Sequence, residues 1–213
     1  MVSPLVNRLV RWGRVERTER FKVLSALVGA LFFLVVLPLL MALVSSWADE
    51  HLGLPPWPPC PINLIPGPVL IGLGLSLVAW SAWAQLRIGR GGPLPVAPPR
   101  HLVITGPYAL CRNPMTLGEF LYLTGLGLLL ASPSFLVLTW AALFPLVVAY
   151  LKLVEERELE ARFGEAYLAY KRRVPFLLPR LRRRWPLSPD MPQEPPVEHG
   201  RKERGHQGPE GGV

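Results

Sequence analysis

Apolar residues gather along this chain into long runs with few or no charged residues. The first run, Val23 to Ser45, reads VLSALVGALFFLVVLPLLMALVS and holds no charge. It exceeds the roughly 20 residues that an α-helix needs to cross a hydrocarbon core about 30 Å thick. Leu64 to Ala84 is a second such run, and Leu117 to Ala131 and Pro133 to Val154 supply two more. The pattern predicts four transmembrane helices, of which the third is the weakest because Glu119 interrupts it.

The first run must also be compared with a cleaved signal peptide. Basic residues precede it, and the sequence SWA at Ser46 to Ala48 resembles a cleavage site. The apolar part of a signal peptide is usually about 7–15 residues long. This run is well beyond that length, so an uncleaved membrane helix is the favoured interpretation.

Basic residues indicate which side of the membrane each loop faces, because Lys and Arg are enriched in cytoplasmic loops. They are frequent before the first run, absent from Trp47 to Asn63, and frequent again in residues 85–116 and after the last run. Four helices with both termini in the cytoplasm satisfy every segment. We therefore interpret the net charge of +8 as topology and contact with anionic lipids of a bacterial inner membrane, rather than as nucleic-acid binding.

Composition divides the chain into four parts. These are a basic cytoplasmic N-terminus (1–22), two N-terminal transmembrane helices (23–84), a core with a transmembrane hairpin and a C-terminal helix (85–180), and a tail (181–213). The tail is rich in Pro, Gly and charge and has nothing to bury, so we expect it to be disordered.

A C-terminal amphipathic helix is expected over Glu155 to Arg173. Apolar and aromatic residues recur there at steps of four, four and three, which places them on one helical face: Leu159, Phe163, Tyr167 and Tyr170. The predicted fold is thus an all-α integral membrane protein with four transmembrane helices, a C-terminal amphipathic helix and a disordered tail.

Polar residues interrupt the apolar pattern at the predicted cytoplasmic edge. The stretch GPYALCRNPMTLGEF, residues 106–120, places an arginine and an asparagine just before Pro114, which suits the first turn of a helix. The short SPS turn at residues 132–134 forces an antiparallel hairpin, which brings this stretch next to Glu155 and Glu156. One interpretation is a helix entry whose arginine reaches lipid headgroups, with two solvated glutamates. The other is a pocket for a small zwitterion that carries a carboxylate, an ammonium and a ribose, since a helix start binds anions and carboxylates accept hydrogen bonds.

These two stretches resemble a known family. GPYALCRNPMTLG followed by EERELEARFGEAYLAYKRRVPFLLP resembles the isoprenylcysteine carboxyl methyltransferase family and its phospholipid methyltransferase relatives, over Gly106 to Pro179. Members of this family are integral membrane enzymes that use S-adenosylmethionine. The resemblance implies catalytic roles for Arg112 and Glu156. It also implies a set of cofactor contacts: Tyr108, Arg112, Asn113, Pro114, Gly118, Glu155 and Glu156.

Two residues depart from the family pattern, and they bear on the acceptor more than on the cofactor. Asn113 stands where many relatives have His, and Thr116 where many have Tyr. A carboxylate acceptor is already a nucleophile at neutral pH, whereas an amine must first lose a proton to a base. No histidine lies inside either stretch, and His101 is the nearest. A carboxylate or thiolate acceptor is therefore mildly favoured over a phospholipid amine, although Glu119 or one of the paired glutamates could act as a base.

The predicted function is methyl transfer from S-adenosylmethionine to a lipophilic acceptor, either an isoprenylcysteine-like molecule or another lipid, in contact with membrane lipids. A phospholipid amine N-methyltransferase is one alternative. An NADPH-dependent oxidoreductase similar to sterol reductases is another, but the paired glutamates would repel a 2′-phosphate. A non-catalytic membrane scaffold is the third, suggested by Asn113 and Thr116. Because Cys60 and Cys111 are predicted on opposite sides and the histidines are scattered, neither a disulfide nor a metal site is expected.

Overall fold

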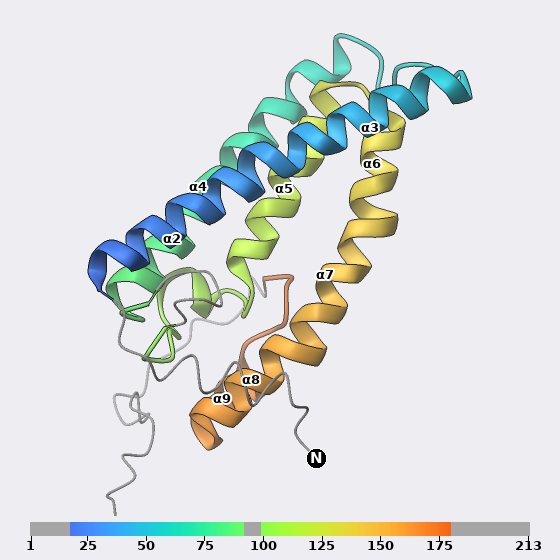
Figure 1. Cartoon of the computed structure of the whole chain (residues 1–213). Helices are drawn as coiled ribbons and strands as arrows, with labels where there is room; N and C mark the ends of the chain where they lie inside the picture. Colours follow the sequence, from blue (N-terminus) through green and yellow to red (C-terminus); the bar gives the residue numbers. More distant parts are fainter. Residues whose placement is uncertain (1–17, 92–98, 180–213) are drawn as a thin grey trace, which may run out of the picture.

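The computed structural model describes residues 18–91 and 99–179 (Figure 1). All regular secondary structure in these two ranges is helical, which confirms the all-α prediction. The predictions for the N-terminus before residue 18 and for the tail from residue 181 onward fall outside the described residues.

Three helices within the described ranges are long and apolar enough to cross a membrane. The first, Arg20–Leu52, runs through α2 (Glu19–Leu31), a π-helical segment (Phe32–Val36) and α3 (Leu37–Leu52). The second, Ile62–Arg87, is a 3₁₀ turn (Ile62–Leu64) followed by α4 (Pro66–Arg87). The third, Pro133–Phe163, joins α6 (Pro133–Val137), α7 (Phe144–Tyr150) and α8 (Glu156–Phe163) through π-helical segments (Leu138–Leu143 and Leu151–Glu155). These helices contain the first, second and fourth apolar runs of the sequence.

The remaining apolar run forms α5, Pro114–Leu129, which has 16 residues. At 1.5 Å per residue this helix is about 24 Å long, shorter than a hydrocarbon core of about 30 Å. Its length therefore does not by itself establish a fourth crossing, and four transmembrane helices remain a prediction.

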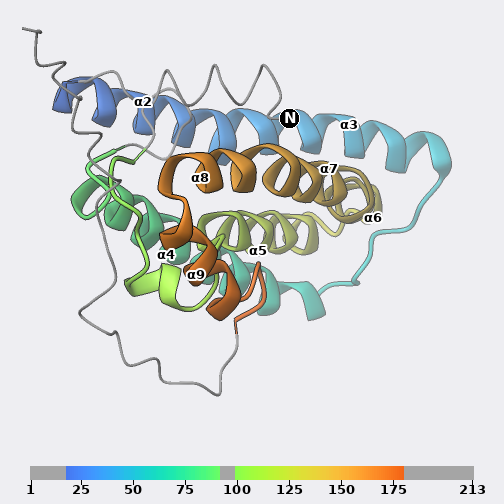
Figure 2. The ribbon, with the colours of Figure 1, turned by 90° about the horizontal axis from the view of Figure 1, so that it is seen from below.

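Glycines bring α4 and α5 together along their length (Figures 1 and 2). A Cβ on Gly74 would lie 2.5 Å from the carbonyl oxygen of Gly118, and a Cβ on Gly118 would lie 2.7 Å from that of Gly74. Farther along, a Cβ on Gly125 would lie 2.7 Å from the carbonyl oxygen of Gly67. Small residues allow such close backbone approach between helices in membranes. One face of α5 is thus committed to α4, and the opposite face is left for a site.

The turn between α5 and α6 lies beside the end of α3. Asp49 accepts a hydrogen bond from the hydroxyl of Ser132 and, at 3.0 Å, from the backbone N–H of Ser134. The N–H of Trp57 donates to the carbonyl oxygen of Ala131 at 2.9 Å. These contacts hold one end of the molecule together, and the polar stretches of the sequence meet at the other end.

The helix predicted from Glu155 to Arg173 is broken at Gly164, which corrects the sequence analysis. Gly164 has φ 52° and ψ −128°, a conformation that costs glycine little because it has no Cβ. Beyond it, α9 (Glu165–Arg173) runs in a different direction from α8 (Figure 2). The residues expected on one helical face nevertheless pack in one cluster: Leu159, Phe163, Tyr167 and Tyr170.

Candidate functional site

A cavity of about 420 Å³ lies between the first transmembrane helix, α4, α5 and the helices from α7 to α9. Its volume is within the range of about 300–1,000 Å³ that small-molecule and cofactor sites occupy. Apolar side chains such as Phe33 and Val147 line one part of it. Polar side chains from the segment before α5, from α8 and from α9 line the other part. The cavity is therefore apolar on one side and charged on the other.

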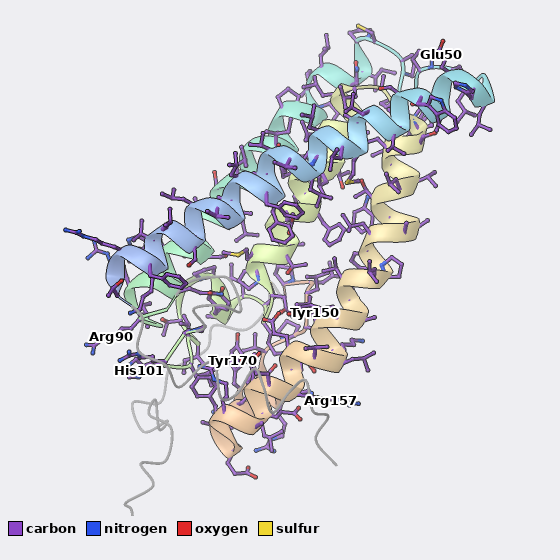
Figure 3. All side chains as sticks on the ribbon, viewed as in Figure 1. Glu50, Arg90, His101, Tyr150, Arg157 and Tyr170 are labelled. Atoms are coloured by element: carbon purple, nitrogen blue, oxygen red, sulfur yellow. The ribbon has the colours of Figure 1, made fainter. Side chains whose placement is uncertain are left out.

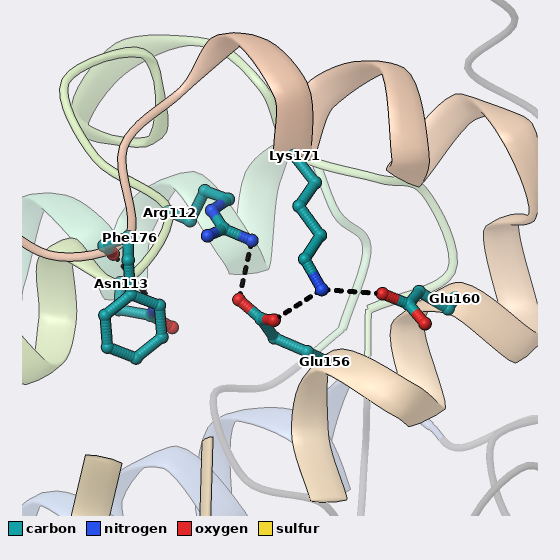
Figure 4. Close-up of polar contacts among 6 residues, drawn as sticks. All are labelled: Arg112, Asn113, Glu156, Glu160, Lys171 and Phe176. Atoms are coloured by element: carbon teal, nitrogen blue, oxygen red, sulfur yellow. Dashed lines mark hydrogen bonds and ion pairs between the residues drawn. The ribbon is translucent and has the colours of Figure 1, made fainter. Parts of the chain in front are cut away.

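A chain of ion pairs links the start of α5 to α8 and α9 in the charged part (Figure 4). Arg112 Nη1 donates to Glu156 Oε1 at 2.6 Å, and Lys171 Nζ lies 2.7 Å from Glu156 Oε2. The same ammonium lies 2.7 Å from Glu160 Oε1. The side chains of Arg112 and Glu156 are only 11% and 10% exposed. Both oxygens of Glu156 are thus matched by a cation, in surroundings where screening by water is weak.

The segment after α9 returns to the start of α5 and holds it. The backbone N–H of Arg112 donates to the carbonyl oxygen of Pro175 at 2.9 Å, and Asn113 Nδ2 donates to that of Phe176 at 3.0 Å. The guanidinium carbon of Arg112 also lies 5.6 Å from the centre of the Phe176 ring, within the range of a cation–π contact. The amide of Asn113 therefore positions backbone in this structure.

Tyr108 connects the segment before α5 to α4 and α9. Its hydroxyl accepts a hydrogen bond from Gln85 Nε2, and its carbonyl oxygen accepts one from the hydroxyl of Tyr170 at 2.7 Å. Burial raises the pKa of Tyr108 and of the neighbouring Tyr167 well above the ordinary value. Both hydroxyls are therefore protonated at neutral pH and can donate hydrogen bonds.

The two adjacent glutamates differ in their partners. The carboxylate of Glu156 pairs with two cations, whereas no hydrogen bond or ion pair joins the carboxylate of Glu155 to the described part of the chain, and Glu155 lines the cavity. Two further polar atoms of the cavity wall are buried without a partner within residues 18–91 and 99–179: Arg112 Nε and Gln85 Oε1. The cavity thus presents both an unmatched donor and unmatched acceptors, which a ligand could satisfy.

Five of the seven residues predicted to contact a cofactor line this cavity: Tyr108, Arg112, Asn113, Glu155 and Glu156. The other two do not. Pro114 is buried at the first turn of α5, and Gly118 faces α4, where close helix packing accounts for the glycine. Their predicted cofactor contacts have no geometric support.

Sequence reasoning missed Lys171 and Gln85 and gave Glu119 only a minor place. Lys171 reaches Glu156 because the chain reverses at Gly164, and that glycine was the available signal. Gln85 ends a long apolar run, where a polar residue is usually read as the edge of the membrane. Nothing local to either residue reveals its partner.

Residues 62–166 match the family model for phospholipid methyltransferases. This part of the chain belongs to the phospholipid methyltransferase family. The match confirms the resemblance seen in the two polar stretches. It also begins at the 3₁₀ turn before α4, and so includes a transmembrane helix in which the sequence analysis found no resemblance.

Two curated proteins are similar to this chain. The cobalt-zinc-cadmium resistance protein CzcN of Cupriavidus metallidurans is 39% identical over 122 residues, which cover 54% of this chain and 51% of that protein. The nickel-cobalt-cadmium resistance protein NccN of Alcaligenes xylosoxydans xylosoxydans is 36% identical over 84 residues, or 38% of this chain and 37% of that protein. The chain thus spans about half the length of the first relative and less of the second. No solved structure gives a significant match.

Proposed function

We propose that this protein transfers a methyl group from S-adenosylmethionine to a lipophilic acceptor at the membrane. The observation that carries the proposal is the occurrence, on one cavity wall, of an unmatched carboxylate on Glu155 and an unmatched guanidinium N–H on Arg112. The amino-acid end of S-adenosylmethionine carries a carboxylate and an ammonium, so it complements both groups. Membership of a methyltransferase family supports this assignment.

The residues of the cavity fit distinct parts of the cofactor. Arg112 Nε would bind its carboxylate, and Glu155 would accept hydrogen bonds from its ammonium or its ribose. Glu156 and Lys171 hold the guanidinium of Arg112 in place, so Glu156 positions Arg112. When bound, S-adenosylmethionine supplies an activated methyl group, which leaves alignment and exclusion of water to the protein.

Equilibrium binding of S-adenosylhomocysteine to the detergent-purified full chain tests the proposal. We expect binding of S-adenosylhomocysteine and not of NADPH. Glu155→Gln should weaken the binding about ten- to a hundredfold, because it removes a charge-assisted hydrogen bond. Arg157→Gln, at an exposed neighbouring position, is the control and should bind like the parent. Unchanged affinity in the Glu155→Gln protein would remove the physical basis of the proposal.

The acidic character of the cavity argues against the oxidoreductase alternative. Four glutamates line the cavity, and the two arginines beside them are already paired: Glu119, Glu155, Glu156, Glu158, Arg112 and Arg162. A 2′-phosphate would add negative charge beside Glu119 and Glu155, whose carboxylates have no counter-charge in the described lining. Tight NADPH binding would reverse this conclusion.

The names of the two relatives suggest a link with metal resistance. Within the described residues, no group of three or more His, Cys, Asp or Glu side chains is placed to hold a metal ion. We therefore propose no metal site.

A further inference from the structure

The charge of the cavity is opposite to that of the chain. The whole chain carries a net charge of +8, yet the described cavity lining holds four glutamates and only two arginines. Each arginine has its own glutamate: Arg112 pairs with Glu156 at 2.6 Å, and Arg162 pairs with Glu158 at 3.2 Å. Two carboxylates, those of Glu119 and Glu155, remain without a counter-charge in the described lining.

Glu119 lies on the face of α5 that is turned away from α4. Met115, Thr116 and Phe120 line the cavity with it, whereas Gly118 packs against α4. Glu119 is five residues into α5, or about 7.5 Å along the helix from its start, at 1.5 Å per residue. It therefore lies between the ion pairs at the start of α5 and the apolar part of the cavity.

No hydrogen bond or ion pair connects the side chain of Glu119 to residues 18–91 or 99–179. An ionised carboxylate is costly in apolar surroundings unless a cation or donors meet it. The nearby cavity wall adds another unmatched acceptor, because Gln85 Oε1 is buried without a partner in the described residues. S-adenosylmethionine carries one net positive charge, so it compensates one of the two free carboxylates. A second cation would compensate the other.

We propose that the methyl acceptor is an aliphatic amine, that Glu119 binds it as an ammonium ion, and that its hydrocarbon tail occupies the apolar part of the cavity. This inference rests on the proposed function, and it names the substrate class of the same site. It also reverses the preference for a carboxylate acceptor drawn from the sequence, because with the cofactor bound a carboxylate would add a second uncompensated negative charge. A headgroup with a phosphate next to the amine is disfavoured for the same reason.

The position of Glu119 also suits the proton that an amine must lose. Glu119 accepts one proton from the ammonium, which frees the nitrogen lone pair. That lone pair forms the new N–C bond with the methyl carbon, while the C–S bond breaks and its electron pair remains on sulfur. The products are a methylammonium ion and a neutral thioether, so charge and atoms balance.

Binding of tritiated dodecylamine to the purified full chain tests the inference without measuring turnover. We expect Glu119→Gln to weaken dodecylamine binding about ten- to a hundredfold. Dodecanol has the same tail without a charge, and its binding should be unchanged, which also shows that the variant is folded. Glu165→Gln removes an exposed carboxylate on α9 and should alter neither. Glu119→Asp retains the charge and should keep the preference for the amine, so it replaces the glutamine variant if that protein does not fold.

Equal dodecylamine binding by the parent and the Glu119→Gln protein would overturn the inference. Displacement of dodecylamine by dodecanoate or phosphatidylethanolamine at lower concentration than by unlabelled dodecylamine would also overturn it. S-adenosylhomocysteine binding, measured on the same samples, separates the two proposals. If S-adenosylhomocysteine binds but Glu119→Gln leaves the affinity for dodecylamine unchanged, only this inference fails. If S-adenosylhomocysteine does not bind but Glu119→Gln weakens dodecylamine binding, the amine site is supported and the methyltransferase proposal fails.

Discussion

Tyr170 connects α9 to the segment before α5 through one buried hydrogen bond. Its hydroxyl donates to the carbonyl oxygen of Tyr108 at 2.7 Å, and the residue is 4% exposed. Tyr170→Phe removes the donor and leaves a buried carbonyl unsatisfied. We expect it to lower the free energy of unfolding by about 1–3 kcal/mol. Reversible unfolding in mixed micelles measures this quantity.

Tyr150 supplies the matched control for this measurement. It is 44% exposed, and its hydroxyl makes no hydrogen bond with the described part of the chain. Tyr150→Phe should change the free energy of unfolding by no more than about 0.5 kcal/mol. Equal losses in the two variants would show that the hydrogen bond of Tyr170 contributes nothing specific.

Single residues also show where sequence reasoning stops. The adjacent glutamates could be singled out from their position after an apolar run, but their different roles could not. Neighbouring helical residues point about 100° apart, so only tertiary contacts decide which one faces a cation. Glu156 is matched by Arg112 and Lys171, which lie far from it in the sequence. Glu155 remains available for a ligand because neither of these cations reaches it.

At the scale of helices, Gly74 and Gly72 of α4 differ in how closely other atoms approach them. A Cβ on Gly74 would lie 2.5 Å from backbone atoms of α5, whereas a Cβ on Gly72 would meet nothing within 4 Å. Gly74→Ala must therefore push the helices apart, and we expect it to lower the free energy of unfolding by about 1–3 kcal/mol. Gly72→Ala should leave stability unchanged or raise it by up to about 1 kcal/mol. Equal effects of the two changes would contradict the close α4–α5 packing.

The long helices could be predicted because the length of an apolar run is read from one segment of the sequence. The apolar runs starting at Val23, Leu64 and Pro133 each lie within a membrane-length helix, because hydrophobic length is a property of the segment alone. The break at Gly164 was not predicted, because the aromatic spacing on either side fits one continuous helix. The packing of Gly74 against α5 could not be predicted either, because the sequence of an apolar helix does not show which other helix its glycines contact.

At the scale of the molecule, the described residues divide into two ends of different charge. Glu50 marks one end in Figure 3, and Arg90, His101 and Arg157 lie at the other, where the cavity has its charged part. The segment from Trp47 to Asn63 contains no Lys or Arg. Because basic residues are enriched in cytoplasmic loops, we expect the charged part of the cavity to face the cytoplasm. That is where a water-soluble cofactor would enter.

The side of the membrane that the charged part of the cavity faces depends on how many helices cross the membrane. Thiol labelling can determine that number. Cys60 is exposed and Cys111 is buried, so the native chain offers a single reactive thiol among the described residues. The second probe is Glu165→Cys in a Cys60→Ser background, at an exposed position of α9. Between residues 60 and 165 the chain passes through α4, α5 and the helix from α6 to α8. If all three cross, the two probes lie on opposite sides; if α5 does not cross, they lie on the same side.

We expect a membrane-impermeant maleimide to label Cys60 in intact spheroplasts and to label the Glu165→Cys protein only after lysis. Lysed spheroplasts should show full labelling of both, which controls for thiol reactivity. The physical reason is the hairpin, since Ser132 and Ser134 at the far end of α5 bind Asp49 at the end of the first transmembrane helix. A 16-residue helix can then complete the crossing only if the bilayer thins locally or polar residues at its ends reach the interface. Labelling of both probes from the same side would show that α5 enters the membrane without crossing it, and would place the cavity on a different side from the one proposed.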